Sequence, residues 1–162
     1  MLVNFEDLNK NSRIWIYQSN KEFTENEVEE LAPIIEEFVS NWQRHGEDLK
    51  ASYKVIYNHF IVLAVDEGFN NVSGCSIDAS VNLIKNLEAK FSVNLTNKLN
   101  ISFKNNNNIN IVNMSDFQKY AKEGKITSNT IVFNNLVTTI EDLEQNWEIP
   151  ADKSWHKRFL VQ

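Results

Sequence analysis

Cysteine is nearly absent from this chain of 162 residues, which contains one, Cys75. A single thiol excludes an internal disulfide and any metal site that needs several cysteines. It also fits a reducing compartment better than an oxidising one. We therefore expect a cytoplasmic protein whose fold does not depend on disulfides.

Long apolar runs are missing as well. The longest, residues 60–65, has the length of a strand and falls far short of the ~20 apolar residues that cross a bilayer. The first residues, MLVNFEDLNKNSRIW, show no basic start followed by an apolar stretch, so no secretory signal is predicted. We expect a soluble protein with no membrane insertion.

Glycine and proline are scarce too, with 4 and 2 residues, so no flexible linker is predicted. No internal repeat is visible. Hydrophobic residues make up 42% of the chain, which is enough for a proper core at this length. We expect one α+β domain over residues 1–162.

Charge and motif content limit the function. The formal net charge is -6, which opposes a large phosphate-binding surface, so no nucleic-acid partner is expected. Neither a phosphate-binding loop nor a dinucleotide-binding glycine motif is present, and the histidines show none of the spacings of a metal site. The sequence therefore predicts no cofactor and no metal.

The first third of the chain predicts a strand and a helix. Residues 13–18 are rich in β-branched and aromatic residues, which is typical of a strand. Thr24 opens a capping-box pattern, and apolar residues then recur at spacings of three and four as far as Trp42. Gly46 supplies a left-handed stop after His45, so we predict that the helix runs to this point.

Two strands and a second helix follow. Residues 52–57 alternate between polar and apolar, which suits an edge strand, whereas residues 60–65 are apolar at every position and belong in the middle of a sheet. Asn58 and His59 form the predicted turn between them. The next apolar stripe predicts a helix over residues 76–90.

A strand at residues 98–104 completes the order strand, helix, strand, strand, helix, strand. That order is typical of a ferredoxin-like split βαβ core (βαββαβ), whose antiparallel-dominated sheet has the first and third strands inside and the second at an edge. The rest of the chain predicts short elements: a turn at 105–108, a hairpin strand at 109–112, a helix at 116–123, a strand at 130–133, a helical turn from about 139 and a tail docked on the domain.

The segment SGCSIDAS, at the start of the second predicted helix, is the strongest candidate for chemistry. A helix N-terminus can lower the pKa of a thiol. Cys75 would then be a nucleophile or redox centre, with Ser76 and Asp78 as polar neighbours and His45, His59 or His156 as base. In the alternative interpretation, Ser76 or Asp78 caps the helix and Cys75 is a small apolar side chain. A carboxylate at Asp78 also disfavours a thiolate.

The tail carries the one basic and aromatic cluster, KSWHKR. Lys157 and Arg158 could contact an anionic ligand while Trp155 stacks on it. The alternative is that Trp155 docks on the domain and leaves the charges in water. We favour docking.

The segments SRIWIYQ, WQRHG, SGCSIDASV, TIVFNNLV and SWHKR together resemble a family of small uncharacterised bacterial proteins. The resemblance covers nearly the full length. Some members carry the name ABC transporter ATPase, which does not fit this chain because the lysine-bearing phosphate loop is missing. The resemblance implies no activity, cofactor or catalytic residue.

These patterns favour a non-catalytic binding or protein-interaction module. The alternative is a small cysteine-dependent enzyme or thiol sensor that uses Cys75. A small-ligand sensor or a homo-oligomer is also left open, because an exposed strand edge invites pairing.

Overall fold

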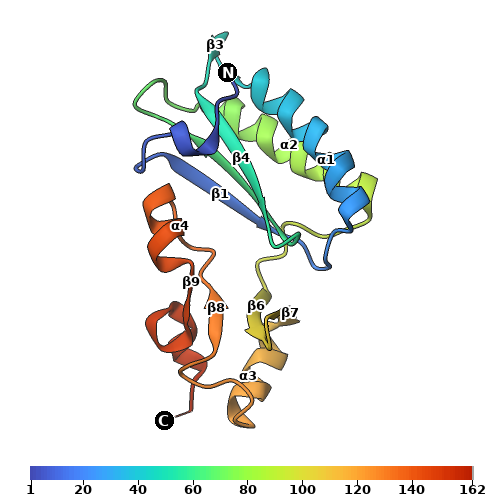
Figure 1. Ribbon diagram of the computed structural model, residues 1–162, viewed down its shortest axis with the longest axis vertical. Helices are drawn as coiled ribbons and strands as arrows, with labels where there is room; N and C mark the ends of the chain where they lie inside the picture. Colours follow the sequence, from blue (N-terminus) through green and yellow to red (C-terminus); the bar gives the residue numbers. More distant parts are fainter. Residues whose placement is uncertain (162) are drawn as a thin grey trace. The chain divides into compact units, whose positions relative to one another are not determined.

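The computed structural model describes residues 1–161 and forms two compact units (Figure 1). The first comprises residues 1–96 with 138–140, and the second residues 97–137 with 141–161. The described chain is α+β, with four α-helices and antiparallel sheets, as predicted. The sequence predicts a single domain over residues 1–162. That the two units fold together as one domain stays a prediction.

The first unit is built on a three-stranded sheet. Its strands β1 (Arg13–Gln18), β4 (Ala51–Ile56) and β5 (Phe60–Val65) lie in the order β1-β5-β4, and both pairings are antiparallel. Every residue of β5 is 0% exposed. The prediction that this wholly apolar run is the central strand is therefore confirmed.

Helices α1 (Glu25–Ser40) and α2 (Gly74–Phe91) lie side by side against one face of this sheet (Figure 1). The predicted capping box is present at the start of α1, where the Thr24 hydroxyl accepts from the Glu27 amide at 3.1 Å. The buried residues between helices and sheet form one cluster: Phe23, Leu31, Ile35, Val39, Trp42, Leu49, Ala51, Ile61, Leu63, Val65, Leu83, Ile84, Leu87, Phe91, Val93 and Leu95.

The first helix is shorter than predicted. α1 ends at Ser40, and the next residues form a hairpin of β2 (Gln43–Arg44) and β3 (Glu47–Asp48). His45 (φ 50°) and Gly46 (φ 82°) make its turn, so His45 does not lie at a helix C-terminus. The indole of Trp42 explains the early end, because it is buried and donates to the Ser76 carbonyl at 2.8 Å.

Two smaller predictions in this unit are also corrected. The turn between β4 and β5 centres on Tyr57 and Asn58, both with positive φ, one residue before the predicted position. The N-cap of α2 is Ser73 rather than Ser76 or Asp78.

The second unit contains a four-stranded antiparallel sheet. Strands β6 (Asn100–Asn105), β7 (Asn108–Asn113), β8 (Ile131–Phe133) and β9 (Glu148–Pro150) lie in the order β7-β6-β8-β9. The prediction that residues 98–104 form the fourth strand of the first sheet is wrong, because β7 and β8 occupy both edges of β6. Residues 138–140 lie beside β1 instead: Thr139 bridges to Arg13, and the Ile14 amide donates to the Thr138 carbonyl at 3.0 Å.

Short helices complete the second unit: α3 (Met114–Lys122), α4 (Ile140–Asn146), and the 3-10 turns η2 (Ala151–Lys153) and η3 (Trp155–Phe159). Its core comprises Ile101, Phe103, Phe117, Ala121, Ile126, Val132 and Ala151. Trp155 and Phe159 pack against this cluster, so the tail is part of the second unit.

Candidate functional site

A groove of about 600 Å³ lies in the first unit beside β4. Its walls are residues 2–7, which include the 3-10 turn η1 (Phe5–Asp7), together with Glu36 of α1 and residues 52–54 of β4. The N-terminal residues, predicted to be an irregular lead-in, thus form one side of the concave surface.

Residues 1–3 cover only the beginning of the outer edge of β4. The Ala51 amide donates to the Met1 carbonyl at 3.1 Å, and the Val3 amide donates to the Ala51 carbonyl at 2.9 Å. The chain then turns away into η1, whose Phe5 is buried. Beyond Ala51, no other strand pairs with this edge among residues 1–161.

Tyr53 and Val55 continue this open edge. Because both backbone groups of Ala51 point away from β5, the alternation of an antiparallel strand directs those of Tyr53 and Val55 the same way. Within residues 1–161, no backbone hydrogen bond satisfies these outward amides and carbonyls. The groove therefore presents the unpaired main-chain donor and acceptor of Tyr53, and the open edge continues beyond it to Val55.

A tyrosine and a carboxylate connect β4 to α1 at the groove. The Tyr53 hydroxyl donates to Glu36 Oε1 at 2.7 Å. Burial and, to a smaller extent, the neighbouring Glu36 together raise the pKa of Tyr53 to about 12. The phenol therefore stays protonated and keeps donating to Glu36 at any physiological pH.

A lysine and a second carboxylate lie on the other wall. Lys54 Nζ is 3.5 Å from Glu6 Oε1 and 4.6 Å from the centre of the Phe5 ring. A backbone hydrogen bond lowers the pKa of Glu6, with a smaller contribution from Lys54. Glu6 is therefore ionised at neutral pH.

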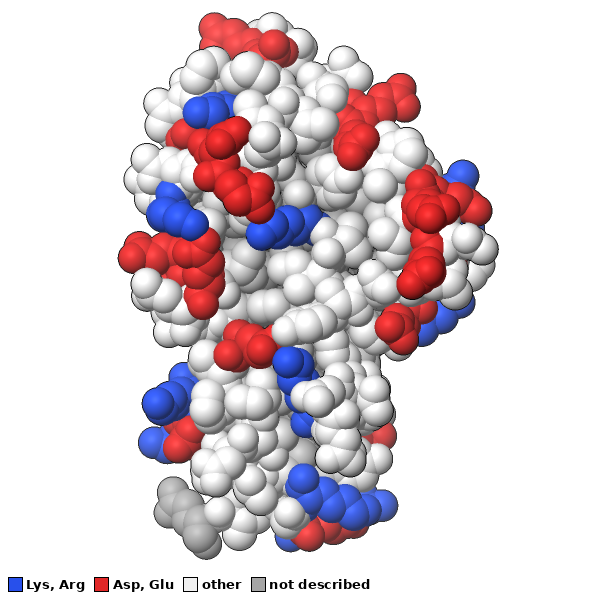
Figure 2. Space-filling model, in the orientation of Figure 1, with Lys and Arg blue, Asp and Glu red and all other residues white. Residues whose placement is uncertain are grey.

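The groove and its surroundings are acidic. Its lining has three carboxylates, Glu6, Asp7 and Glu36, against one ammonium, Lys54. Helix α1 carries six glutamates and no lysine or arginine, and acidic side chains dominate the side of the molecule where α1 lies (Figure 2). This charge balance favours cationic ligands over anionic ones.

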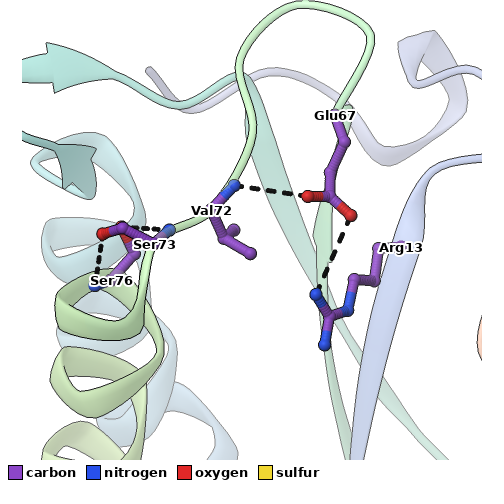
Figure 3. Close-up of polar contacts among 5 residues, drawn as sticks. All are labelled: Arg13, Glu67, Val72, Ser73 and Ser76. Carbon is purple, nitrogen blue, oxygen red and sulfur yellow. Dashed lines mark hydrogen bonds and ion pairs between the residues drawn. The ribbon is translucent and has the colours of Figure 1, made fainter.

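The predicted Cys75 site has a different geometry. Cys75 is exposed in the first turn of α2, and Asp78 is exposed one turn further on. Ser76 is 1% exposed: its hydroxyl donates to the Gln43 carbonyl at 2.8 Å, and the Ser73 and Ser76 side chains and amides form a capping box (Figure 3). Ser76 therefore stabilises the helix start, and none of the described residues forms a hydrogen bond to the thiol of Cys75.

A carboxylate fixes the loop before α2. Glu67 accepts a hydrogen bond from the Val72 amide at 3.3 Å and lies 3.9 Å from the Arg13 guanidinium (Figure 3). Arg13 also stacks over the Trp15 ring at 4.7 Å. These contacts explain the loop geometry without any ligand, and the sequence pattern did not indicate them.

None of the predicted bases forms a hydrogen bond to Cys75 within residues 1–161. His45 is exposed in the β2–β3 turn, and His59 is buried beside the Ser19 carbonyl, where burial lowers its pKa. His156 belongs to the second unit, is 0% exposed, and has its Nδ1 2.7 Å from the Ser154 hydroxyl. Burial, with a smaller contribution from the charge of Arg158, lowers the pKa of His156 to about 4.

The tail residues predicted to bind a ligand lie around this histidine. Trp155 stacks on the His156 ring at 4.0 Å. The Arg158 guanidinium lies 5.3 Å from the Trp155 ring centre and 4.7 Å from that of Phe159, whereas Lys157 is exposed. One face of Trp155 and the side chain of Arg158 are therefore already engaged within the unit.

No protein-family model, curated protein or solved structure matches this chain. Membership in the bacterial family that the sequence resembles thus stays a prediction. Among residues 1–161, no cluster of three or more potential metal ligands is present, and no helix has the length and apolar character needed to span a bilayer.

Proposed function

We propose that this protein is a non-catalytic interaction module that binds an extended, basic segment of a partner protein along the edge of β4. Peptides that add a strand to an open sheet edge gain affinity from main-chain hydrogen bonds and specificity from the flanking side chains. The observation that carries the proposal is the open edge of β4, where the outward backbone groups of Tyr53, in the groove, and of Val55, next along the edge, are unpaired.

Residues 1–3 support this mode of binding, because they already use the same edge. Their hydrogen bonds to Ala51 show that the edge accepts an added strand at its first residue. A bound segment would continue that pairing past Tyr53. Its side chains would meet Glu36 on one wall of the groove and Glu6 on the other, which is the reason to expect lysine or arginine in the segment.

Fluorescence anisotropy with two labelled peptides tests the proposal. A short peptide of alternating Val and Lys should bind, whereas one of alternating Val and Glu should not. Glu36→Gln keeps an acceptor for Tyr53 but removes one charge, so it should weaken binding of the Lys peptide about threefold to fivefold. Glu37→Gln is the matched control, because Glu37 is exposed on the same helix but does not line the groove.

The main-chain contribution is tested with N-methylated peptides. Two versions of the Lys peptide would carry methyl groups on alternate amides, one set facing β4 and the other facing solvent. Only one version should lose binding, because only one set of amides forms hydrogen bonds to the strand edge. Equal binding by the two versions, or equal weakening by Glu36→Gln and Glu37→Gln, would contradict the proposal.

The finer fold assignment and the location also stay proposals. The order β1-β5-β4 with two helices on one face supports the ferredoxin-like interpretation for the first unit, although β6 does not complete that sheet. A cytoplasmic location is supported by the lone thiol, which is exposed. The cysteine-dependent enzyme is less well supported, because no described base contacts that thiol.

A further inference from the structure

The edge strand β7 of the second unit differs from the other sheet edges of this protein. It reads Asn-Ile-Asn-Ile-Val-Asn and contains no charged residue, proline or glycine. Natural edge strands usually carry charges, proline or bulges that prevent pairing with another chain. At the opposite edge of the same sheet, β9 has Glu148 and Pro150, so the protection is missing on one side only.

The register of β7 is fixed by its turn. Asn106 (φ 53°) and Asn107 (φ 68°) both adopt the left-handed conformation of a two-residue hairpin turn. The pair that flanks such a turn, Asn105 with Asn108, is hydrogen-bonded, and hydrogen-bonded pairs then recur at every second residue. Asn110 therefore faces β6.

Ile109 and Ile111 consequently direct their amides and carbonyls away from β6. No backbone hydrogen bond among residues 1–161 satisfies these groups. The two side chains lie on the same side of the strand and are only partly buried. The edge thus presents unpaired backbone groups together with apolar side chains.

We infer that a second copy of this chain pairs with β7 in antiparallel fashion, around a two-fold axis at Asn110. The strand is symmetric about this residue, since an isoleucine precedes it and another follows it. In this register Ile109 of each copy lies opposite Ile111 of the other, and both pairs are hydrogen-bonded. All the outward backbone groups of Ile109 and Ile111 are then satisfied.

The same register explains why the partner is a second copy. A two-fold interface requires one surface to be complementary to itself, and this uncharged strand meets that requirement without bringing like charges together. The isoleucines of the two copies come together on one side of the joined sheet. The Asn110 side chains meet on the other, where amide groups can both donate and accept. This interface does not depend on the β4 groove.

Sedimentation equilibrium of the intact protein is the first test. The wild type should show a concentration-dependent dimer. Ile111→Pro removes the outward amide while proline remains compatible with a strand edge, so it should weaken dimerisation at least tenfold. A wild type that stays monomeric throughout, or an Ile111→Pro variant with unchanged self-association, would overturn the inference.

A disulfide tests the position of the axis. Asn110 would face its own copy as a non-hydrogen-bonded pair, whose Cα atoms lie about 4.5 Å apart, within the range that a disulfide bridges. In a Cys75→Ser background, Asn110→Cys should therefore form an intermolecular disulfide readily on mild oxidation. Asn108→Cys on the same strand is the matched control and should not. Equal cross-linking of the two variants would refute the proposed register, and no cross-linking of Asn110→Cys would refute the interface.

Discussion

Acidification should destabilise the second unit through His156. The side chain is 0% exposed and lies between Trp155, at 4.0 Å, and Phe117, whose ring centre is 5.6 Å away. Burial lowers the pKa of His156 from 6.5 to about 4, with a smaller contribution from Arg158. The folded protein therefore resists protonation of a group that the unfolded chain protonates readily.

The sign and size of the effect follow from this difference. Above pH 6.5 the histidine is neutral in both states and does not change stability. As the pH falls from 6.5 towards 4, only the unfolded chain gains the proton, so the free energy of unfolding falls. The loss through His156 amounts to about 2 kcal/mol at pH 5 and about 3 kcal/mol at pH 4.

Urea unfolding at pH 7.5 and pH 5 measures the loss in the wild type and in His156→Gln. The variant cannot titrate at this position, so its free energy of unfolding should fall by about 2 kcal/mol less between the two pH values. His59, whose pKa is also lowered, is present in both proteins and cancels in the comparison. NMR titration of the wild type gives a check that needs no variant: a native His156 resonance that titrates near pH 6.5 would refute the reasoning.

Two substitutions in the first turn of α2 should differ in their effect on the free energy of unfolding, measured by urea unfolding at neutral pH. Ser76→Ala removes the buried hydroxyl that completes the capping box and donates to the Gln43 carbonyl, and should cost about 1–3 kcal/mol. Cys75→Ser, at the exposed preceding position, should stay within about 0.5 kcal/mol of the wild type. A larger loss for Cys75→Ser than for Ser76→Ala would contradict the roles assigned to them.

The best-predicted parts of the fold are those in which local pattern and tertiary environment agree. Residues 60–65 are apolar at every position, and β5 is buried over its whole length. Thr24 begins a capping box that is present in the structure. The turn predicted at residues 105–108 is also present, and its central residues Asn106 and Asn107 adopt the left-handed conformation that asparagine tolerates.

The errors arose where distant contacts override a local pattern. The apolar spacing of the first helix continues to Trp42, yet the helix ends at Ser40. The Trp42 indole instead donates a hydrogen bond to Ser76, which is 34 residues away in the sequence. The strand near residue 100 was expected in the first sheet because its position in the order fits. Only the pairings of β6 with β7 and β8 place it in the second.

Almost nothing in the local sequence pattern predicted the candidate groove. Glu6, Glu36 and Tyr53 come from three separate segments, and the N-terminal residues pair with Ala51 through main-chain atoms that sequence patterns do not specify. The alternation of β4 indicates which side chains share a face. It does not indicate that one edge of the strand stays open.

Amide hydrogen exchange along β4, followed by NMR, tests the proposed binding mode most directly. In the free protein the amides of Ser52 and Lys54, which face β5, should exchange slowly, and those of Tyr53 and Val55 should exchange fast. Saturation with the Lys peptide should slow Tyr53 and Val55 specifically. Slow exchange at these two amides before any peptide is added, or unchanged exchange at saturation, would contradict strand addition at this edge.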